Sequence, residues 1–375
     1  MSRKRRLVSI LAIAFVILAF AAWSARARIW MALFDRVVEA NVGVDRSAAL
    51  PNGLHVYVCG SGSPLADAER AGPCLAVLAG KDAFVFDSGS GSVRKLLRMG
   101  FPVEKLRAVF LTHLHSDHLD GLGELLLQAW VGGSRGTPLP VYGPAGIEQV
   151  VAGFREAYSL DSGYRAAHHG PKIVDPAGFG GVARVIPVPI AAPAKATVWE
   201  ANGVRITVIK VAHPPIQPAY GYRIDYKGRS VAISGDTVYS PDFVASSQRV
   251  DVMFHEALNK PMLNAMSKAL KRRGRANAAQ IMIDIQDYHS TPQDAARAAQ
   301  NAHARALVLY HLVPSIPRGL MESAFVGDAD KRFDGTLKVS RDGMLVSLPA
   351  GSKAIDFDQE LWGVPKRENG ASDGT

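Results

Sequence analysis

The sequence contains little cysteine and only a moderate share of charged residues. Cys59 and Cys74 are the only cysteines among 375 residues, and charged residues make up 21% of the chain. Two cysteines exclude a disulfide-stapled miniprotein and a zinc site built from thiolates. They lie at the end of one strand-like run and the start of the next, so an exported chain can bridge them. The sequence is equally consistent with two free buried thiols in place of a disulfide. In neither case is a cysteine the nucleophile.

Acidic residues are absent from the first 28 residues, which carry six positive charges. These six residues are Arg3, Lys4, Arg5, Arg6, Arg26 and Arg28. The whole chain has a formal net charge of +9, so the remaining residues carry only +3. The overall basicity of the protein therefore indicates little about its partners.

The amino-terminal segment predicts export. Leu7–Trp23 is an uncharged run of 17 residues, and a bilayer-spanning helix needs at least about 17. Four positive charges before the run and two after it place the amino terminus inside and the body outside. Ala25-Arg26-Ala27 offers a cleavage site, but the run is longer than the roughly 7–15 apolar residues of a signal peptide. We predict a signal anchor over residues 1–28, with a cleaved signal peptide as the alternative. The body would lie on the periplasmic side, attached to the inner membrane.

The rest of the chain divides into a linker, one large domain and a tail. Residues 29–50 are predicted to be a linker, and residues 351–375 a polar tail. Between them, over residues 51–350, short apolar runs punctuated by glycine come in groups before each helical stretch. This order favours sheets that pack on each other with helices outside, and disfavours a doubly wound parallel fold. The sequence therefore predicts an α+β domain preceded by one hydrophobic helix.

The segment Thr112-His113-Leu114-His115-Ser116-Asp117-His118 follows a strand-like run directly. Alternation along an extended chain points His113 and His115 to the same side. Asp117 and His118 lie just beyond and can turn towards a second point. One short loop therefore offers ligands to two cations, and imidazole and carboxylate ligands suit zinc when no thiolate is present. A surface or core role is common for one or two histidines, but it does not explain this cluster.

The pattern His-x-His-x-Asp-His, preceded by Phe86-Asp87-Ser88-Gly89, resembles the metallo-β-lactamase superfamily. The resemblance covers most of residues 54–345 and implies a four-layer αββα sandwich with a binuclear metal site at one edge. The remaining motifs are Val211-Ala212-His213-Pro214, Ser234-Gly235-Asp236-Thr237 and Tyr310-His311. The resemblance implies two Zn²⁺ ions per chain, the first held by His113, His115, His213 and Asp236, the second by Asp117, His118, Asp236 and His311. It also implies that Asp87 orients a ligand.

Two carboxyl-terminal motifs, His255-Glu256-Ala257 and His289-Ser290-Thr291, resemble the ribonuclease Z and arylsulfatase-like branch. In that branch the histidine of His-Ser-Thr is a catalytic proton donor, which implies this role for His289. A helix-capping segment in which only Ser290 matters is the alternative. Glu256 is expected to orient His289 or another histidine, or else to stabilise a buried strand end. Asp117 is a catalytic candidate as well as a metal ligand.

The resemblance implies a zinc-dependent hydrolase of ester bonds that uses a hydroxide bridging the two metals. Export favours a small sulfate or phosphate ester as substrate, as in the arylsulfatase-like members, and a pocket rimmed by Tyr220, Tyr222 and Arg223. Nucleic acid is expected to be an unlikely partner despite the basic run Lys268–Arg275, and the membrane a partner through the amino-terminal helix. The alternatives are a ribonuclease Z-like phosphodiesterase or endonuclease, and a lactone or β-lactam hydrolase. A binding protein without turnover is less favoured, and no oligomeric state is predicted.

Overall fold

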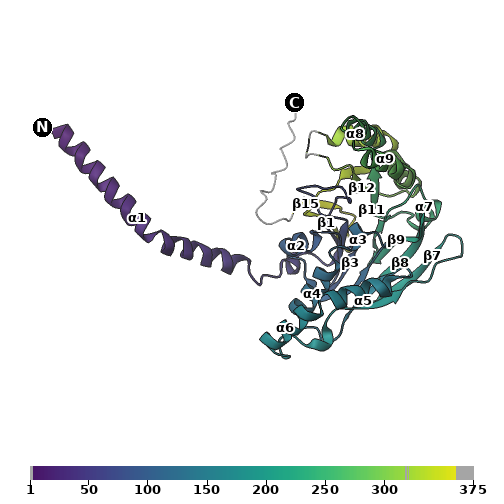
Figure 1. The fold of residues 1–375 in the computed structure, drawn as a ribbon, viewed down its shortest axis with the longest axis horizontal. Coiled ribbons are helices and arrows are strands. Elements are labelled where there is room, and N and C mark those ends of the chain that lie inside the picture. Colours follow the sequence, from purple (N-terminus) through teal and green to yellow (C-terminus); the bar gives the residue numbers. More distant parts are fainter. Residues whose placement is uncertain (1–2, 317–318, 320, 360–375) are drawn as a thin grey trace. The chain divides into compact units, whose positions relative to one another are not determined.

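A computed structural model describes residues 3–316, 319 and 321–359 (Figure 1). The chain divides into two compact units, one ending at Arg46 and the other beginning at Ser47. The first unit consists mainly of helix α1 (Arg3–Asn41), which covers the predicted signal segment and part of the predicted linker. No single helix within the described residues is long and apolar enough to cross a membrane. Ile10–Ile17 and Ala22–Asn41, bent by 43° from each other, together have that length and composition.

The second unit contains two β-sheets, with strand orders β15-β14-β1-β2-β3-β4-β5-β6 and β13-β12-β11-β10-β9-β8-β7. The strands of the first sheet are β1 (Gly53–Gly60), β2 (Cys74–Ala79), β3 (Asp82–Phe86), β4 (Leu106–Phe110), β5 (Leu139–Gly143), β6 (Gly181–Val185), β14 (Met344–Pro349) and β15 (Asp356–Gln359). Those of the second are β7 (Lys195–Ala201), β8 (Val204–His213), β9 (Ile216–Tyr226), β10 (Arg229–Ile233), β11 (Val252–Leu258), β12 (Ala306–Val313) and β13 (Thr336–Val339).

Helices connect the strands of this unit. The α-helices are α2 (Ser92–Arg98), α3 (Ser116–Leu119), α4 (Leu122–Gly133), α5 (Ile147–Ala157), α6 (Ser159–His169), α7 (Pro241–Ser246), α8 (Lys260–Arg272), α9 (Ala276–Asp284), α10 (Pro292–Asn301) and α11 (Glu322–Val326). The 3₁₀ turns are η1 (Arg46–Ala49), η2 (Val103–Lys105), η3 (Pro176–Gly178), η4 (Ile285–Asp287) and η5 (Ala329–Arg332).

Three apolar layers hold these elements together. The inner faces of the two sheets meet in one core, to which Phe86 and Phe110 contribute from the first sheet and Ile224 from the second. A second core lies between the first sheet and helices α2, α4 and α5, and a third between the second sheet and helices α7 and α10. Most central strands are therefore buried on both faces, which explains their nearly continuous apolar sequences. The predicted αββα sandwich and the helix before it are confirmed (Figure 1).

The predicted pocket rim of Tyr220, Tyr222 and Arg223 is wrong. Both tyrosines are fully buried in the core between the sheets, where the Tyr222 hydroxyl donates to the Leu111 carbonyl at 2.6 Å. Arg223 forms an ion pair with Asp225 at 2.9 Å. Alternation along β9 placed the tyrosines on one face, but that face packs inside the sandwich.

A disulfide and an added edge strand complete the first sheet. Cys59 and Cys74 form a disulfide, with Cα atoms 5.1 Å apart. Of the two alternatives left open by the sequence, the structure therefore has the disulfide. The bond joins β1 to β2 at the two ends of the loop between them. Strand β15 lies within the predicted polar tail and pairs with β14. The remainder of that tail, residues 360–375, lies outside the described residues.

Candidate metal centre

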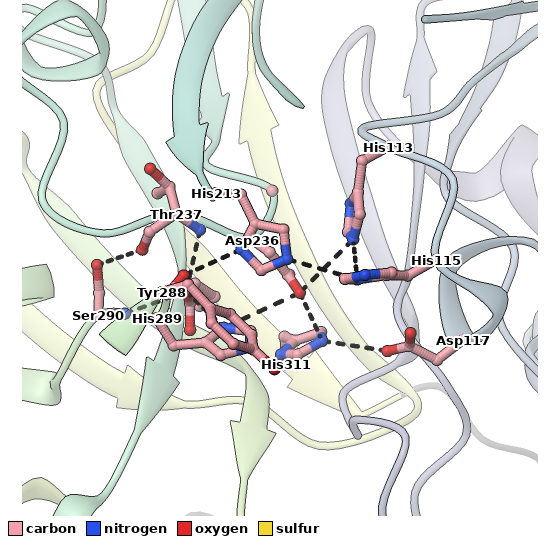
Figure 2. Close-up of polar contacts among 12 residues, drawn as sticks. His113, His115, Asp117, His213, Asp236, Thr237, Tyr288, His289, Ser290 and His311 are labelled. Atoms are coloured by element: carbon pink, nitrogen blue, oxygen red, sulfur yellow. Dashed lines mark hydrogen bonds and ion pairs between the residues drawn. The ribbon is translucent and has the colours of Figure 1, made fainter. Parts of the chain in front are cut away.

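The predicted metal ligands come from both sheets and meet at one edge of the sandwich (Figure 2). His113 and His115 follow β4, His213 ends β8, and Asp236 follows β10. Strands β10, β11 and β12 run parallel, and the carboxyl ends of parallel strands reach the same edge of a sheet. The other three ligand candidates are Asp117 and His118 in α3 and His311 in β12.

A β-bulge turns His311 towards this edge. Tyr310 pairs with Glu256 and Leu312 pairs with Ala257, so His311 has no partner on β11. Its φ of 47° lies in the left-handed region, which is uncommon for a residue other than glycine. Bulges bend a strand and re-aim side chains, and they occur often beside active sites. Tyr310 consequently points into the core between the sheets, whereas His311 faces the candidate ligands.

Three histidine nitrogens converge at the first candidate position. His115 Nδ1 lies 2.8 Å from His113 Nε2 and 3.4 Å from His213 Nε2. Each neutral imidazole has one nitrogen that accepts, and three such nitrogens facing one point suit a shared cation better than a shared proton. Nitrogen donors of this kind are common zinc ligands.

Asp236 lies between this histidine group and a second one. Its Oδ2 atom is 4.0 Å from His113 Nε2, 3.3 Å from His118 Nε2 and 3.2 Å from His311 Nε2. Asp117 Oδ2 lies 3.3 Å from the same His311 nitrogen. His118 Nε2 and Asp236 Oδ1 are buried with no hydrogen-bond partner among the described residues. Buried polar atoms without partners are costly, so these donors fit a divalent metal ion.

Other contacts fix the orientation of the histidine rings. His118 Nδ1 donates to Asp87 Oδ2 at 2.8 Å, which leaves Nε2 facing Asp236. His213 Nδ1 donates to the Tyr288 carbonyl at 3.0 Å. Such outer contacts hold the tautomer that presents the other nitrogen to a metal. Asp87 therefore occupies an orienting position, whereas the role of Tyr288 was missed because a backbone carbonyl leaves no signal in the sequence.

The electrostatics of the cluster favour a cation. Burial lowers the pKa of His113 well below its usual value, and neighbouring His118 adds to the effect. Burial also lowers the pKa of His118, but Asp236, Asp87 and other carboxylates outweigh it and raise the pKa well above normal. Burial raises the pKa of Asp236, but His311 and His118 outweigh it and hold that pKa well below its usual range. The Asp236 carboxylate is therefore ionised, and together with Asp87 and Asp117 it stabilises positive charge in this buried space.

His289 lies beside these groups and is held by Glu256. His289 Nδ1 donates to Glu256 Oε1 at 2.9 Å, and the same oxygen accepts from the backbone amides of Thr237 and Ser290. The His289 ring centroid is 5.1 Å from that of His213. Burial lowers the pKa of His289, but Glu256 and Asp236 together outweigh burial and raise the pKa to about 9. Thr291, not Ser290, caps helix α10, and the Ser290 hydroxyl instead donates to the carbonyl of Thr237, the residue after Asp236. His289 lies among the candidate ligands.

Comparisons with known proteins agree with this architecture. A family model described as the beta-lactamase superfamily domain matches residues 83–312. Ribonuclease Z of Mycobacterium bovis is 34% identical over 291 residues, which are 77% of this chain and 96% of that protein. Ribonuclease Z of Mycobacterium marinum is 33% identical with the same coverage.

Two solved structures share the fold. The metallo-beta-lactamase fold protein YhfI from Bacillus subtilis has a TM-score of 0.56 and 22% identity, and the match covers 79% of this chain and all of that one. The short form of human tRNase Z also has a TM-score of 0.56, with 20% identity over 79% of this chain and 99% of its own. These two structures support the fold alone.

The ribonuclease Z relatives overturn one prediction. Nucleic acid was expected to be an unlikely partner because the segment before the domain predicts export, yet relatives that match over nearly their whole length are ribonucleases by name. The same relatives, together with the histidine and aspartate cluster, establish a metal-dependent hydrolase of ester bonds. The chain belongs to the metallo-β-lactamase superfamily, in its ribonuclease Z branch.

Proposed function

We propose that the protein is a phosphodiesterase that cleaves RNA. The observation that carries this proposal is the 34% identity to a ribonuclease Z over 96% of that protein's length. The sequence predicted an arylsulfatase-like enzyme, with a ribonuclease Z-like enzyme as an alternative. The relatives favour the ribonuclease Z-like alternative. The geometry of the centre suits such a reaction, since it places candidate metal ligands beside a candidate proton donor.

We propose two zinc ions as the cofactor. His113, His115 and His213 would hold one, and Asp117, His118 and His311 the other, with Asp236 shared between them. When bound, divalent cations in such a site supply Lewis acidity, which makes water nucleophilic at neutral pH and offsets negative charge on the substrate.

His289 would complete the reaction by protonating the leaving oxygen. A ribose hydroxyl is a poor leaving group, so RNA cleavage gains from a proton delivered as the phosphorus–oxygen bond breaks. With Nδ1 bound to Glu256, Nε2 is the nitrogen free to give up a proton. Glu256 raises the pKa of this imidazole and so favours its protonated form. Glu256 is a positioning residue, because it acts through His289 and through two backbone amides.

The substrate class can be tested directly on the purified full-length chain loaded with zinc. We expect cleavage of end-labelled RNA, loss of that cleavage when a chelator removes the metal, and no comparable turnover of aryl sulfates. The reason is that the relatives carry a nuclease name, while a metal site alone does not select phosphorus over sulfur. Gel analysis of the RNA and absorbance of the released phenol measure the two reactions. Rapid sulfate hydrolysis with intact RNA would reject the proposal.

We also propose that the body lies outside the cytoplasm, anchored through the amino-terminal helix. The Cys59–Cys74 disulfide supports this, since disulfides persist mainly in oxidising compartments. We expect activity from a reporter enzyme that works only outside the cytoplasm when it is fused after the body. The two cysteines should resist alkylation in intact cells. An inactive reporter together with two reactive thiols would place the body inside instead.

A further inference from the structure

The segment between Glu256 and His289 contributes only the Tyr288 carbonyl to the site described above. Residues 259–288 lie between Glu256 and His289 and form a helical hairpin of α8, α9 and η4 (Figure 1). The backbone amide of Leu258 donates to the Ser290 carbonyl at 2.7 Å, so the hairpin leaves and re-enters the domain at one place. Ser267 Oγ donates to the Ala279 carbonyl at 2.8 Å, which joins the two helices side by side.

Positive charge is concentrated on this hairpin. Residues 259–288 contain six lysines and arginines and two aspartates, a net charge of +4. Residues 29–375 as a whole carry +3, so without the hairpin they would carry −1. We call five of the six cations the basic tip: Lys268, Lys271, Arg272, Arg273 and Arg275, all exposed. None of the five has an acidic partner within 4.0 Å among the described residues, and such unpaired cations attract phosphates.

The base of the hairpin forms part of the wall of the metal centre. Tyr288 accepts a hydrogen bond from His213, and its ring centroid is 5.1 Å from the His213 ring and 4.9 Å from the His289 ring. The Tyr288 side chain remains partly exposed, and an aromatic ring at such a place can stack on a base. Apolar contacts of Leu263 and Met282 with Leu258 and Val313 fix the base on strands β11 and β12.

The length of α8 sets the distance from this base to the basic tip. Helix α8 has 13 residues, and at 1.5 Å per residue it spans about 20 Å. Gln286 of the returning segment bonds to Asn264 at 3.0 Å, near the base, so the turn at Gly274 is the far end. A strand that enters the metal centre and follows the hairpin would therefore meet the basic tip several nucleotides away.

We propose that the hairpin is the surface on which the RNA strand docks, with the basic tip holding backbone phosphates up to about 20 Å from the base of the hairpin. This inference rests on the proposed RNA cleavage and adds where the strand lies. The basic side chains would contact the phosphates and not the bases, so the hairpin would bind RNA without selecting a sequence. Met266, Ile281 and Ile283 are also partly or largely exposed on the hairpin, which makes an anionic membrane the competing partner.

The test compares two triple variants of the full chain in a His289→Ala background, where bound RNA is cleaved slowly. One carries Lys271→Gln, Arg272→Gln and Arg273→Gln in the basic tip. The matched control carries Lys227→Gln, Arg249→Gln and Lys353→Gln, which remove the same charge from exposed residues near the other ends of β10, β11 and β12. Fluorescence anisotropy measures the affinity for labelled RNAs of about 4 and about 16 nucleotides at several salt concentrations. Thermal unfolding checks that all variants remain folded.

We expect the hairpin variant to lose at least about tenfold in affinity for the longer RNA, because three phosphate contacts are lost. The slope of log affinity against log salt should fall by about 2, at about 0.7 per contact for a single strand. The control variant should keep the parent's affinity and slope. Equal losses in both variants would overturn the proposal, since they would reflect net charge alone.

Two further outcomes separate the proposals. Suppose that vesicles of phosphatidylcholine and phosphatidylglycerol bind the parent but not the hairpin variant, and that the two proteins bind RNA with equal affinity. The hairpin then docks on membranes, and the inference fails. If RNA binds through the hairpin but the protein with His289 intact does not cleave it, the docking inference stands and the proposed function fails.

Discussion

Replacing Asp236 with alanine is expected to remove at least one metal ion and nearly all hydrolytic activity. Asp236 Oδ2 lies within 4.0 Å of ring nitrogens from both candidate groups, so neither group is complete without it. Loss of an outer partner of a ligand commonly costs 10–100-fold, and loss of a shared ligand should cost more than about 100-fold. Metal content by mass spectrometry and RNA cleavage rates measure the two effects.

Asp120→Ala is the matched control for this experiment. Asp120 is exposed, comes directly after helix α3, and belongs to none of the groups of converging ligand atoms among the described residues. Its backbone amide bonds to Ser116, a contact that the substitution retains. The control should keep its metal and its activity. An Asp236→Ala protein with two bound ions and full turnover would show that the binuclear assignment is wrong.

Replacing His289 with alanine should have a different signature, because a proton donor is not a metal ligand. We expect unchanged metal content and a fall in kcat for RNA of about 10²–10⁴-fold, the usual contribution of an acid catalyst. The loss should be much smaller for an aryl phosphodiester whose phenolate leaves without a proton. Steady-state rates on the two substrates measure this difference.

Glu256→Gln provides a second variant with the same expected pattern. The glutamine keeps an oxygen for the amides of Thr237 and Ser290 but removes the negative charge that raises the pKa of His289. RNA cleavage should therefore fall and aryl ester hydrolysis should fall less, with metal retained. Equal losses on both substrates would assign His289 a positioning role, and loss of metal from His289→Ala would make it a ligand.

Much of the fold and the candidate site could be predicted from sequence because the signals are local. Ligand candidates such as His113 and His115 lie in one short segment, and others such as His213 follow apolar runs that end at a sheet edge. Apolar runs separated by glycine indicated strands, and their grouping before helices indicated packed sheets. These features require only neighbours in the chain.

The residues that were placed wrongly depend on contacts between distant segments. Alternation shows that Tyr220 and Tyr222 share a face of β9, but only the packing of the two sheets decided that this face is buried. The pairing of Cys59 with Cys74, one of the two alternatives that the sequence left open, also required β1 and β2 to be neighbours.

The sequence by itself determined the architecture and the candidate ligands, whereas tertiary structure decided how they are aimed and what surrounds them. The bulge at His311 depends on its pairing with β11, and the Tyr288 carbonyl meets His213 only after the hairpin has folded back. The charge of the hairpin was visible in the sequence but was averaged into a net charge of +3 for residues 29–375. The hairpin charge can attract a substrate only because the hairpin lies beside the metal centre, since electrostatic attraction depends on distance in space and not on separation along the chain.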